Sequence, residues 1–113
     1  MPPPPVDQLP LTVPVFHVLL SLVDQELHGY ALIKDIEGRT GGEVRLTAST
    51  LYGALARMLD ARLIEEQPAP GDERRRRYRI TRAGRALVRE EAARLDRAGK
   101  WARAKGLLTR NSR

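Results

Sequence analysis

Residues 63–81 constrain the fold more than any other part of the chain. They begin with LIEEQ and end with RYRIT, and the residues between include Pro-Gly-Asp, a turn-forming combination. In the second run Tyr78 and Ile80 fall on one face and arginines on the other, which is the period-two pattern of a half-buried strand. This stretch therefore predicts a β-hairpin with a long tip.

The predicted hairpin tip is strongly basic. The arginines concerned are Arg74, Arg75, Arg76, Arg77 and Arg79. The whole chain has a formal net charge of +6 and a pI near 10.5, which favours a polyanionic partner such as nucleic acid or an anionic membrane. A charge run is also an ordinary solvated surface, so the tip alone does not decide between these interpretations.

Several classes of function lack their signatures in the sequence. The 113 residues contain no cysteine, which excludes disulfides, thiolate metal sites and cysteine nucleophiles and agrees with a cytoplasmic location. No apolar run approaches the roughly 20 residues of a membrane span. We find no catalytic carboxylate pair, no metal-ligand spacing and no phosphate-binding glycine loop. The sequence therefore predicts one domain that is not an enzyme and needs no metal or cofactor.

The sequence predicts two helices within residues 11–39. The first covers residues 11–23, with Thr12 as its cap, and is apolar on nearly every side, as expected of a helix at the centre of the domain. Within it, His17 is expected to be a satisfied core histidine. The preceding residues 1–10 are proline-rich and are expected to form a disordered tail without a packing role.

The second expected helix covers residues 28–39. His28 opens it in a capping position, and its apolar stripe includes Tyr30, which is expected to pack in the core. The Gly41-Gly42 pair ends it, and residues 43–46 then alternate polar and apolar, as in a short extended piece.

A third helix is expected over residues 47–62, with Thr47 as its cap. Its apolar face consists of Leu51, Leu55, Met58 and Leu59. The opposite face consists of Ser49, Thr50, Gly53, Ala56, Arg57 and Asp60. Exposed helices without a partner usually carry long charged side chains, so this small, hydroxylated face indicates close approach to another surface.

The last helix is expected over residues 82–108, capped by Thr81, with residues 109–113 as a frayed tail. Its apolar seam consists of Leu87, Val88, Ala92, Leu95, Ala98, Trp101 and Ala102. This seam is longer than three short helices can cover, so we expect it to form a dimer interface with a second copy.

The order of these elements predicts a mainly α fold with a small β-hairpin. Residues 11–81 form a winged helix-turn-helix and residues 82–108 a C-terminal dimerisation helix. In such a domain the third helix enters the DNA major groove and the hairpin, or wing, lies on the backbone or in the minor groove. The expected base and backbone contacts from the third helix are Thr47, Ser49, Thr50, Tyr52, Gly53 and Arg57. The wing arginines are expected to contact phosphates or the minor groove.

Two alternatives remain open at this point. The third helix could dock on a protein groove, or the basic surfaces could bind nucleic acid without sequence preference. The first is disfavoured because both unusual surfaces lie on one side of the fold. A DNA footprint distinguishes the second from sequence-specific binding, because specific binding protects a symmetric site and non-specific binding protects the DNA uniformly.

The motifs HGYALIKDIE, TASTLYGALARM, RLIEE and RRRRYRITRAGRALV resemble those of the PadR family of bacterial transcription regulators. The resemblance implies a homodimeric winged-helix protein of the subgroup with a short C-terminal region, most often a repressor, acting on a pseudo-palindromic double-stranded operator. The chain departs from the family pattern at Ser49 and at Arg62, where glycine is usual. Arg62 is therefore expected either to extend the helix or to be strained. As a further hypothesis, Trp101 from two subunits binds a planar apolar effector that releases DNA.

Overall fold

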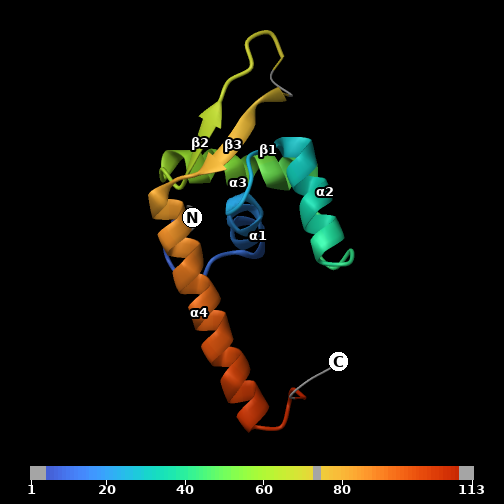
Figure 1. The fold of residues 1–113 in the computed structure, drawn as a ribbon, viewed down its shortest axis with the longest axis vertical. Coiled ribbons are helices and arrows are strands. Elements are labelled where there is room, and N and C mark those ends of the chain that lie inside the picture. The colour runs from blue at the N-terminus through green and yellow to red at the C-terminus, as the bar shows by residue number, and fades with distance from the viewer. Residues whose placement is uncertain (1–4, 73–74, 110–113) are drawn as a thin grey trace.

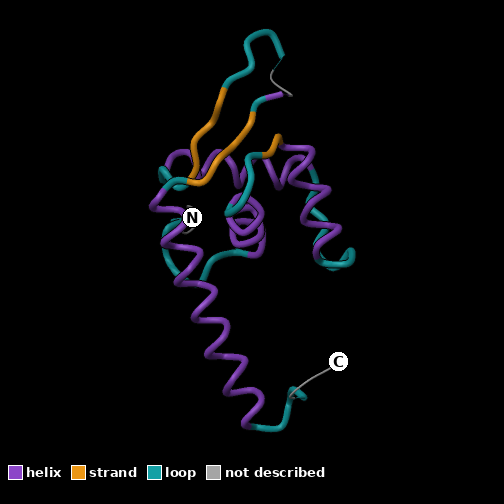
Figure 2. The backbone as a smooth tube through the Cα atoms, in the orientation of Figure 1, coloured by secondary structure: helices purple, strands orange, loops and turns teal. Residues whose placement is uncertain are grey.

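The computed structural model describes residues 5–72 and 75–109. The helices in this part are α1 (Val13–Leu22), α2 (Gly29–Arg39), α3 (Ala48–Asp60) and α4 (Arg82–Ala104), and the strands are β1 (Leu27–His28), β2 (Ile64–Gln67) and β3 (Arg77–Ile80). Figure 1 shows the β2–β3 hairpin projecting from one end of the molecule and α4 from the other. The tube in Figure 2 follows three helices, a hairpin and a last helix, which confirms the predicted fold class.

Helix α1 lies at the centre of the domain, as its apolar surface predicts. It contacts α2, α3, α4 and β3, and Val15, Val18, Leu19 and Leu22 are buried in the core. The cap is local: the Thr12 Oγ1 atom accepts a hydrogen bond from the Val15 N–H at 3.4 Å. Burial of one central helix by three others is what gives this small domain its core.

Helix α2 differs from the sequence prediction in which residues it buries. Leu32 and Ile36 are fully buried, whereas Tyr30 is 68% exposed and lies beneath the ammonium of Lys34, 5.7 Å from the ring centroid. Tyr30 is therefore not a core residue. The reason is rotation about the helix axis: positions 29, 32 and 36 share the face toward α1 and α3, and position 30 lies about 100° away from position 29.

The sheet contains a third strand that the sequence did not predict. Strand β3 pairs with β2 through Ile64↔Ile80 and, on its other edge, with β1 through His28↔Arg77, both antiparallel. His28 was expected to cap α2, but its side chain makes no capping hydrogen bond, and its backbone belongs to β1. Two residues are too few to display a period, so only the tertiary pairing identifies this strand. Residues 43–46 form no strand.

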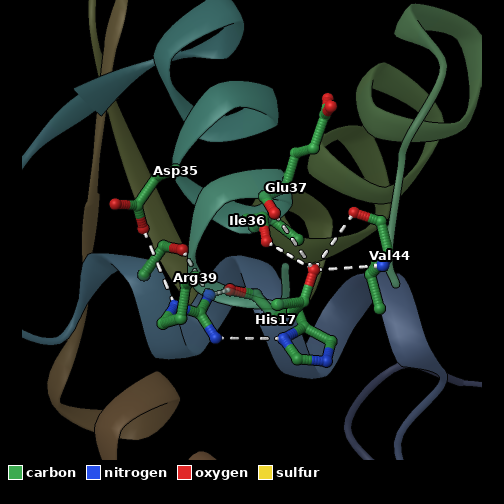
Figure 3. A network of polar contacts seen from close by, with 8 residues as sticks. His17, Asp35, Ile36, Glu37, Arg39 and Val44 are labelled. Atoms are coloured by element: carbon green, nitrogen blue, oxygen red, sulfur yellow. Dashed lines mark hydrogen bonds and ion pairs between the residues drawn. The ribbon is translucent and has the colours of Figure 1, made fainter. Parts of the chain in front are cut away.

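A compact turn joins α2 to α3, and part of its hydrogen-bond network is drawn in Figure 3. Gly41 and Gly42 adopt φ values of 62° and 84°, and the Gly42 N–H donates to the Glu37 carbonyl at 2.8 Å. The Thr40 hydroxyl donates to the Ile36 carbonyl at 2.8 Å and accepts from the Val44 N–H at 3.0 Å. The predicted stop at the two glycines is therefore confirmed.

Arg39 ties α2 to α1 in the same region (Figure 3). Its guanidinium donates to His17 Nδ1 at 3.1 Å and to the Ser21 hydroxyl at 2.7 Å, and it lies 3.8 Å from the Asp35 carboxylate. Partial burial, followed by the charge of Arg39, lowers the pKa of His17. His17 is thus a hydrogen-bonded structural histidine, as the sequence predicts, although it lies at the edge of the core.

The N-terminal segment packs on the domain, contrary to the expectation of a tail without contacts. Val6 and Leu9 lie against the core, and the Leu11 N–H donates to the Glu91 carboxylate at 3.0 Å. Glu91 is 2% exposed, and its second partner is Arg94 at 2.6 Å. The hydrogen bond from Arg94 lowers the pKa of Glu91. Residues 1–4 of the predicted tail lie outside the described residues.

Two residues set the junction between the hairpin and α4. The Thr81 hydroxyl accepts from the Gly84 N–H at 3.0 Å, as predicted for a cap, and donates to the Arg62 carbonyl at 2.8 Å. Arg62 adopts a φ of 61°, the left-handed region, so the strained alternative is the correct one for this position. The backbone bends at Arg62. Leu63 then lies against the first turn of α4, and β2 begins at the next residue.

Helix α4 ends at Ala104, earlier than the predicted 108, and Gly106 follows with a φ of 81°. The C-terminal half of the helix extends away from the other elements, and the longest dimension of the molecule is 54 Å (Figure 1). No helix in the described part of the chain combines the length and apolar character needed to cross a bilayer. Residues 110–113 of the predicted frayed tail lie outside that part.

Candidate nucleic-acid interface

The two faces of α3 are as different in the structure as in the sequence. The buried residues are Leu51, Ala54, Leu55 and Met58, while Leu59 is only partly buried. The exposed residues include Ser49, Thr50, Gly53, Ala56 and Asp60. Apart from Tyr52, the exposed side chains in the first two turns of α3 are no larger than threonine. Another surface can therefore approach this helix closely.

The hydroxyl groups at the start of α3 are arranged in a chain. The Thr47 Oγ1 accepts from the Thr50 N–H at 3.1 Å, which confirms the predicted cap. The Thr47 hydroxyl also donates to the Thr50 Oγ1 at 3.0 Å. Because the Thr50 oxygen accepts this bond, its own hydrogen can donate outward to an acceptor such as a base edge or a phosphate.

Tyr52 is held in position by α2. It is half exposed, and an added Cβ at Gly29 would touch its hydroxyl and lie 2.7 Å from its Cζ atom. Only glycine at position 29 therefore allows this ring to lie against the backbone of α2. This contact gives a physical reason for the HGY and TLY motifs to occur together, and it makes Tyr52 a packing residue as well as a candidate DNA contact.

Arg57 lies farther along α3 than the other candidate residues. It is partly buried, and it lines a groove of about 510 Å³ together with residues 5, 6 and 8–12 and Val15. Within the described residues Arg57 has no ion pair. The sequence did not indicate that the N-terminal segment lies beside this guanidinium.

The basic hairpin contains two kinds of arginine. Arg75 and Arg77 are exposed and make no ion pair within the described residues. By contrast, Arg76 pairs with Glu66 at 3.0 Å and Arg79 with Glu65 at 2.9 Å. Arg74 lies outside the described residues. The sequence interpretation treated the arginines as equivalent, and only the pairing of β2 with β3 places Glu65 opposite Arg79.

The inner face of the hairpin anchors it to the domain. Tyr78 is buried, as predicted, and Ile80 is partly buried against the core. Burial, and then the neighbouring carboxylate of Glu66, raises the pKa of Tyr78 to about 12. The phenol is therefore neutral at physiological pH and acts as a packing residue.

The seam on α4 divides into a part covered by its own domain and a part that is not. Val88 is 4% exposed within the single chain and belongs to the core, so it is not available as an interface residue. Leu87 is partly buried against the same core. Farther along, Leu95 is exposed and Trp101 is 71% exposed. Ala92 and Ala98 are also exposed, and Ala102 is partly exposed. The seam that lacks an intramolecular partner therefore begins after Glu91.

The comparisons with known proteins agree on one family. A model described as the transcriptional regulator PadR-like family matches residues 18–90. Transcriptional regulator Rv3488 of Mycobacterium tuberculosis is 37% identical over 81 residues, covering 71% of this chain and 73% of that protein. An uncharacterised 37.1 kDa protein in transposon TN4556 of Streptomyces fradiae is 43% identical over 75 residues, 66% of this chain. The match spans only 21% of that longer relative.

The solved structures show the same fold. A transcriptional regulator of Clostridium thermocellum superposes with a TM-score of 0.71 at 25% identity, covering 81% of this chain and 90% of that one. Bacillus subtilis PadR, solved in complex with operator DNA, gives a TM-score of 0.60 at 20% identity, covering 72% of this chain and 47% of that one. This chain is therefore a winged helix-turn-helix protein of the PadR-like family, whose members are transcription regulators and not enzymes.

Proposed function

We propose that this chain is a homodimeric, sequence-specific DNA-binding repressor that a small ligand releases from its operator. The observation that carries the proposal is the exposed face of α3, with its small side chains and its exposed Thr50, beside a basic hairpin. A helix that enters the major groove needs a face without long obstructing side chains and with donors for base edges. In this arrangement Ser49, Thr50 and Gly53 face the bases.

The hairpin supplies contacts that do not depend on sequence. Arg75 and Arg77 are exposed and make no ion pair within the described residues, so they are available for phosphates. Each phosphate contact contributes about −0.9 to the slope of log K against log salt concentration. Two such contacts per hairpin predict about −1.8. Replacing both arginines with alanine should remove this part of the slope on every DNA sequence.

The exposed part of the α4 seam supports a dimer. Leu95, Ala98 and Trp101 are apolar residues on the half of α4 that extends away from the other described elements (Figure 1). Pairing with a second copy buries this strip and places two α3 helices about a two-fold axis, which matches a pseudo-palindromic operator. Leu95→Asp should convert the dimer to a monomer in sedimentation equilibrium, whereas Asp96→Asn, beside it, should not.

Trp101 is the candidate ligand contact. Its ring is largely exposed in the single chain, and two rings brought together across the dimer axis would form an apolar slot. We propose that a planar apolar compound bound there changes the spacing of the two α3 helices and releases DNA. Because the chain has a single tryptophan, fluorescence quenching reports on this site directly. No response across a broad panel of planar compounds would contradict this part of the proposal.

A binding-site selection followed by a footprint at defined salt tests the central claim. We expect one enriched sequence with two symmetric half-sites about 10 bp apart or a multiple of that spacing. Uniform protection of any duplex would instead favour non-specific, architectural binding. Failure to bind DNA would favour a protein-interaction module.

A further inference from the structure

The hairpin contains its own carboxylates opposite two of its arginines. Glu65 on β2 is the direct cross-strand partner of Arg79 on β3, and their side chains meet at 2.9 Å. Glu66 on the next position reaches Arg76 at 3.0 Å. The two ion pairs lie on opposite faces of the hairpin because successive strand residues alternate.

In the free protein these ion pairs hold the arginines beside the carboxylates. Each pair is nevertheless weak enough for a phosphate to displace the carboxylate. The Arg79 and Glu65 side chains are each about half exposed, and exposed pairs of this kind contribute only about 0.2–1 kcal/mol to stability. Their importance lies in competition. A carboxylate held on the neighbouring strand acts at an effective concentration of the order of mM or above, which a phosphate in a loose encounter does not match.

A phosphate that is held in place by other contacts competes on different terms. Once α3 lies in the groove, the hairpin is fixed against the backbone, and the phosphate there acts at a comparable effective concentration. The arginine can then exchange its carboxylate for the phosphate. In a complex without a docked α3, contacts from Arg75 and Arg77 alone leave the hairpin free to move along the backbone, so no single phosphate stays beside Arg79.

We propose that Glu65, with Glu66 as a second member, is an internal counterion that restrains sequence-independent DNA binding. Arg75 and Arg77 contact any DNA, whereas Arg79 contacts phosphate only when α3 is docked on its operator. This inference rests on the proposed function as a sequence-specific DNA-binding protein. It makes Glu65 a specificity-determining residue although it contacts no base.

The test compares two DNA duplexes of equal length, the selected operator and a scrambled sequence, with the full chain. We expect Glu65→Gln to steepen the salt slope on the scrambled duplex by about 0.9 per hairpin. At 0.15 M salt this corresponds to a roughly fivefold rise in affinity per hairpin. On the operator the slope should not change, because Arg79 already contacts phosphate there.

Two further variants separate this role from a simple change of charge. Glu37→Gln removes the same charge from an exposed pair with Arg45, at 3.9 Å, at the end of α2 remote from the hairpin, and should leave both slopes unchanged. The double variant Glu65→Gln/Arg79→Gln should return the slope on the scrambled duplex to that of the unmodified protein.

The outcomes are distinct. An unchanged slope on the scrambled duplex, or an equal gain on both duplexes, overturns the role of Glu65 while the function as a specific DNA-binding protein stands. Absence of DNA binding by the unmodified protein overturns both. Selective tightening on the scrambled duplex, reversed in the double variant, supports the proposal.

Discussion

Replacing Gly84 with alanine should destabilise the junction between the hairpin and α4. An added Cβ would touch the Leu63 carbonyl oxygen and lie 2.9 Å from the Ile80 Cγ1 and 3.1 Å from the Leu63 carbonyl carbon. Two of these three atoms belong to backbone, which cannot rotate away as a side chain does. The first turn of α4 must therefore shift relative to β2.

The size of this effect follows from two opposing contributions. Overpacking of this kind costs about 1–3 kcal/mol, and the upper end applies because the contact is with backbone. The better helix propensity of alanine returns about 0.5–1 kcal/mol. The net loss is about 2 kcal/mol, which for a domain of about 100 residues lowers the Tm by roughly 8–16 °C.

Thermal unfolding followed by far-UV circular dichroism measures the effect. The matched control is Gly38→Ala in α2, where an added Cβ meets no atom within 4 Å. The same substitution there should raise the Tm, because only the propensity gain remains. If Gly84→Ala proved as stable as Gly38→Ala, the inference that glycine is required for close packing at this junction would be refuted.

Four other outcomes can be measured. Arg62→Gly should stabilise the protein by about 1 kcal/mol in urea unfolding because glycine adopts the φ of 61° without strain, and no gain would contradict the strain argument. Glu91→Leu should lose about 1–3 kcal/mol by leaving the Leu11 N–H without its acceptor. Because the folded-state pKa of Glu91 is lowered, its charge stabilises the protein above pH 4.5 and this contribution is lost at lower pH, so the variant should show a weaker acid dependence. His17 also has a lowered folded-state pKa, so stability should decline as pH falls below 6.5, and His17→Gln should flatten that decline in urea titrations. Thr50→Val should change the selected operator sequence without changing the salt slope, whereas an equal loss of affinity on every DNA sequence would assign Thr50 to phosphate contact.

The sequence predicted those features that depend on short-range geometry. Thr12, Thr47 and Thr81 were each expected to cap a helix, and each accepts a backbone hydrogen bond from the residue three positions later. The strand pattern of Tyr78 and Ile80 predicted the hairpin in the same way. Such contacts join residues close in the chain, so residue type and spacing alone determine them.

The candidate DNA-binding face was predictable for a related reason. The exposed side of α3 is the complement of its apolar stripe, and a helix of known period has no other way to arrange the two. The arrangement of Ser49 and Thr50 therefore followed from the position of Leu51 and Leu55. The order of the elements also predicted that the hairpin lies beside this face of α3.

The remaining features depend on contacts between residues far apart in the chain, and the tertiary structure decided them. Strand β1 exists because β3 offers it an edge, and Tyr30 is exposed because α2 turns positions 32 and 36 toward the core. Val88 is a core residue because α4 passes over α1. Which of the described hairpin arginines form an ion pair likewise depends on the register of β2 against β3. Local rules determined the elements, and the packing of those elements determined which side chains remained exposed to meet a partner.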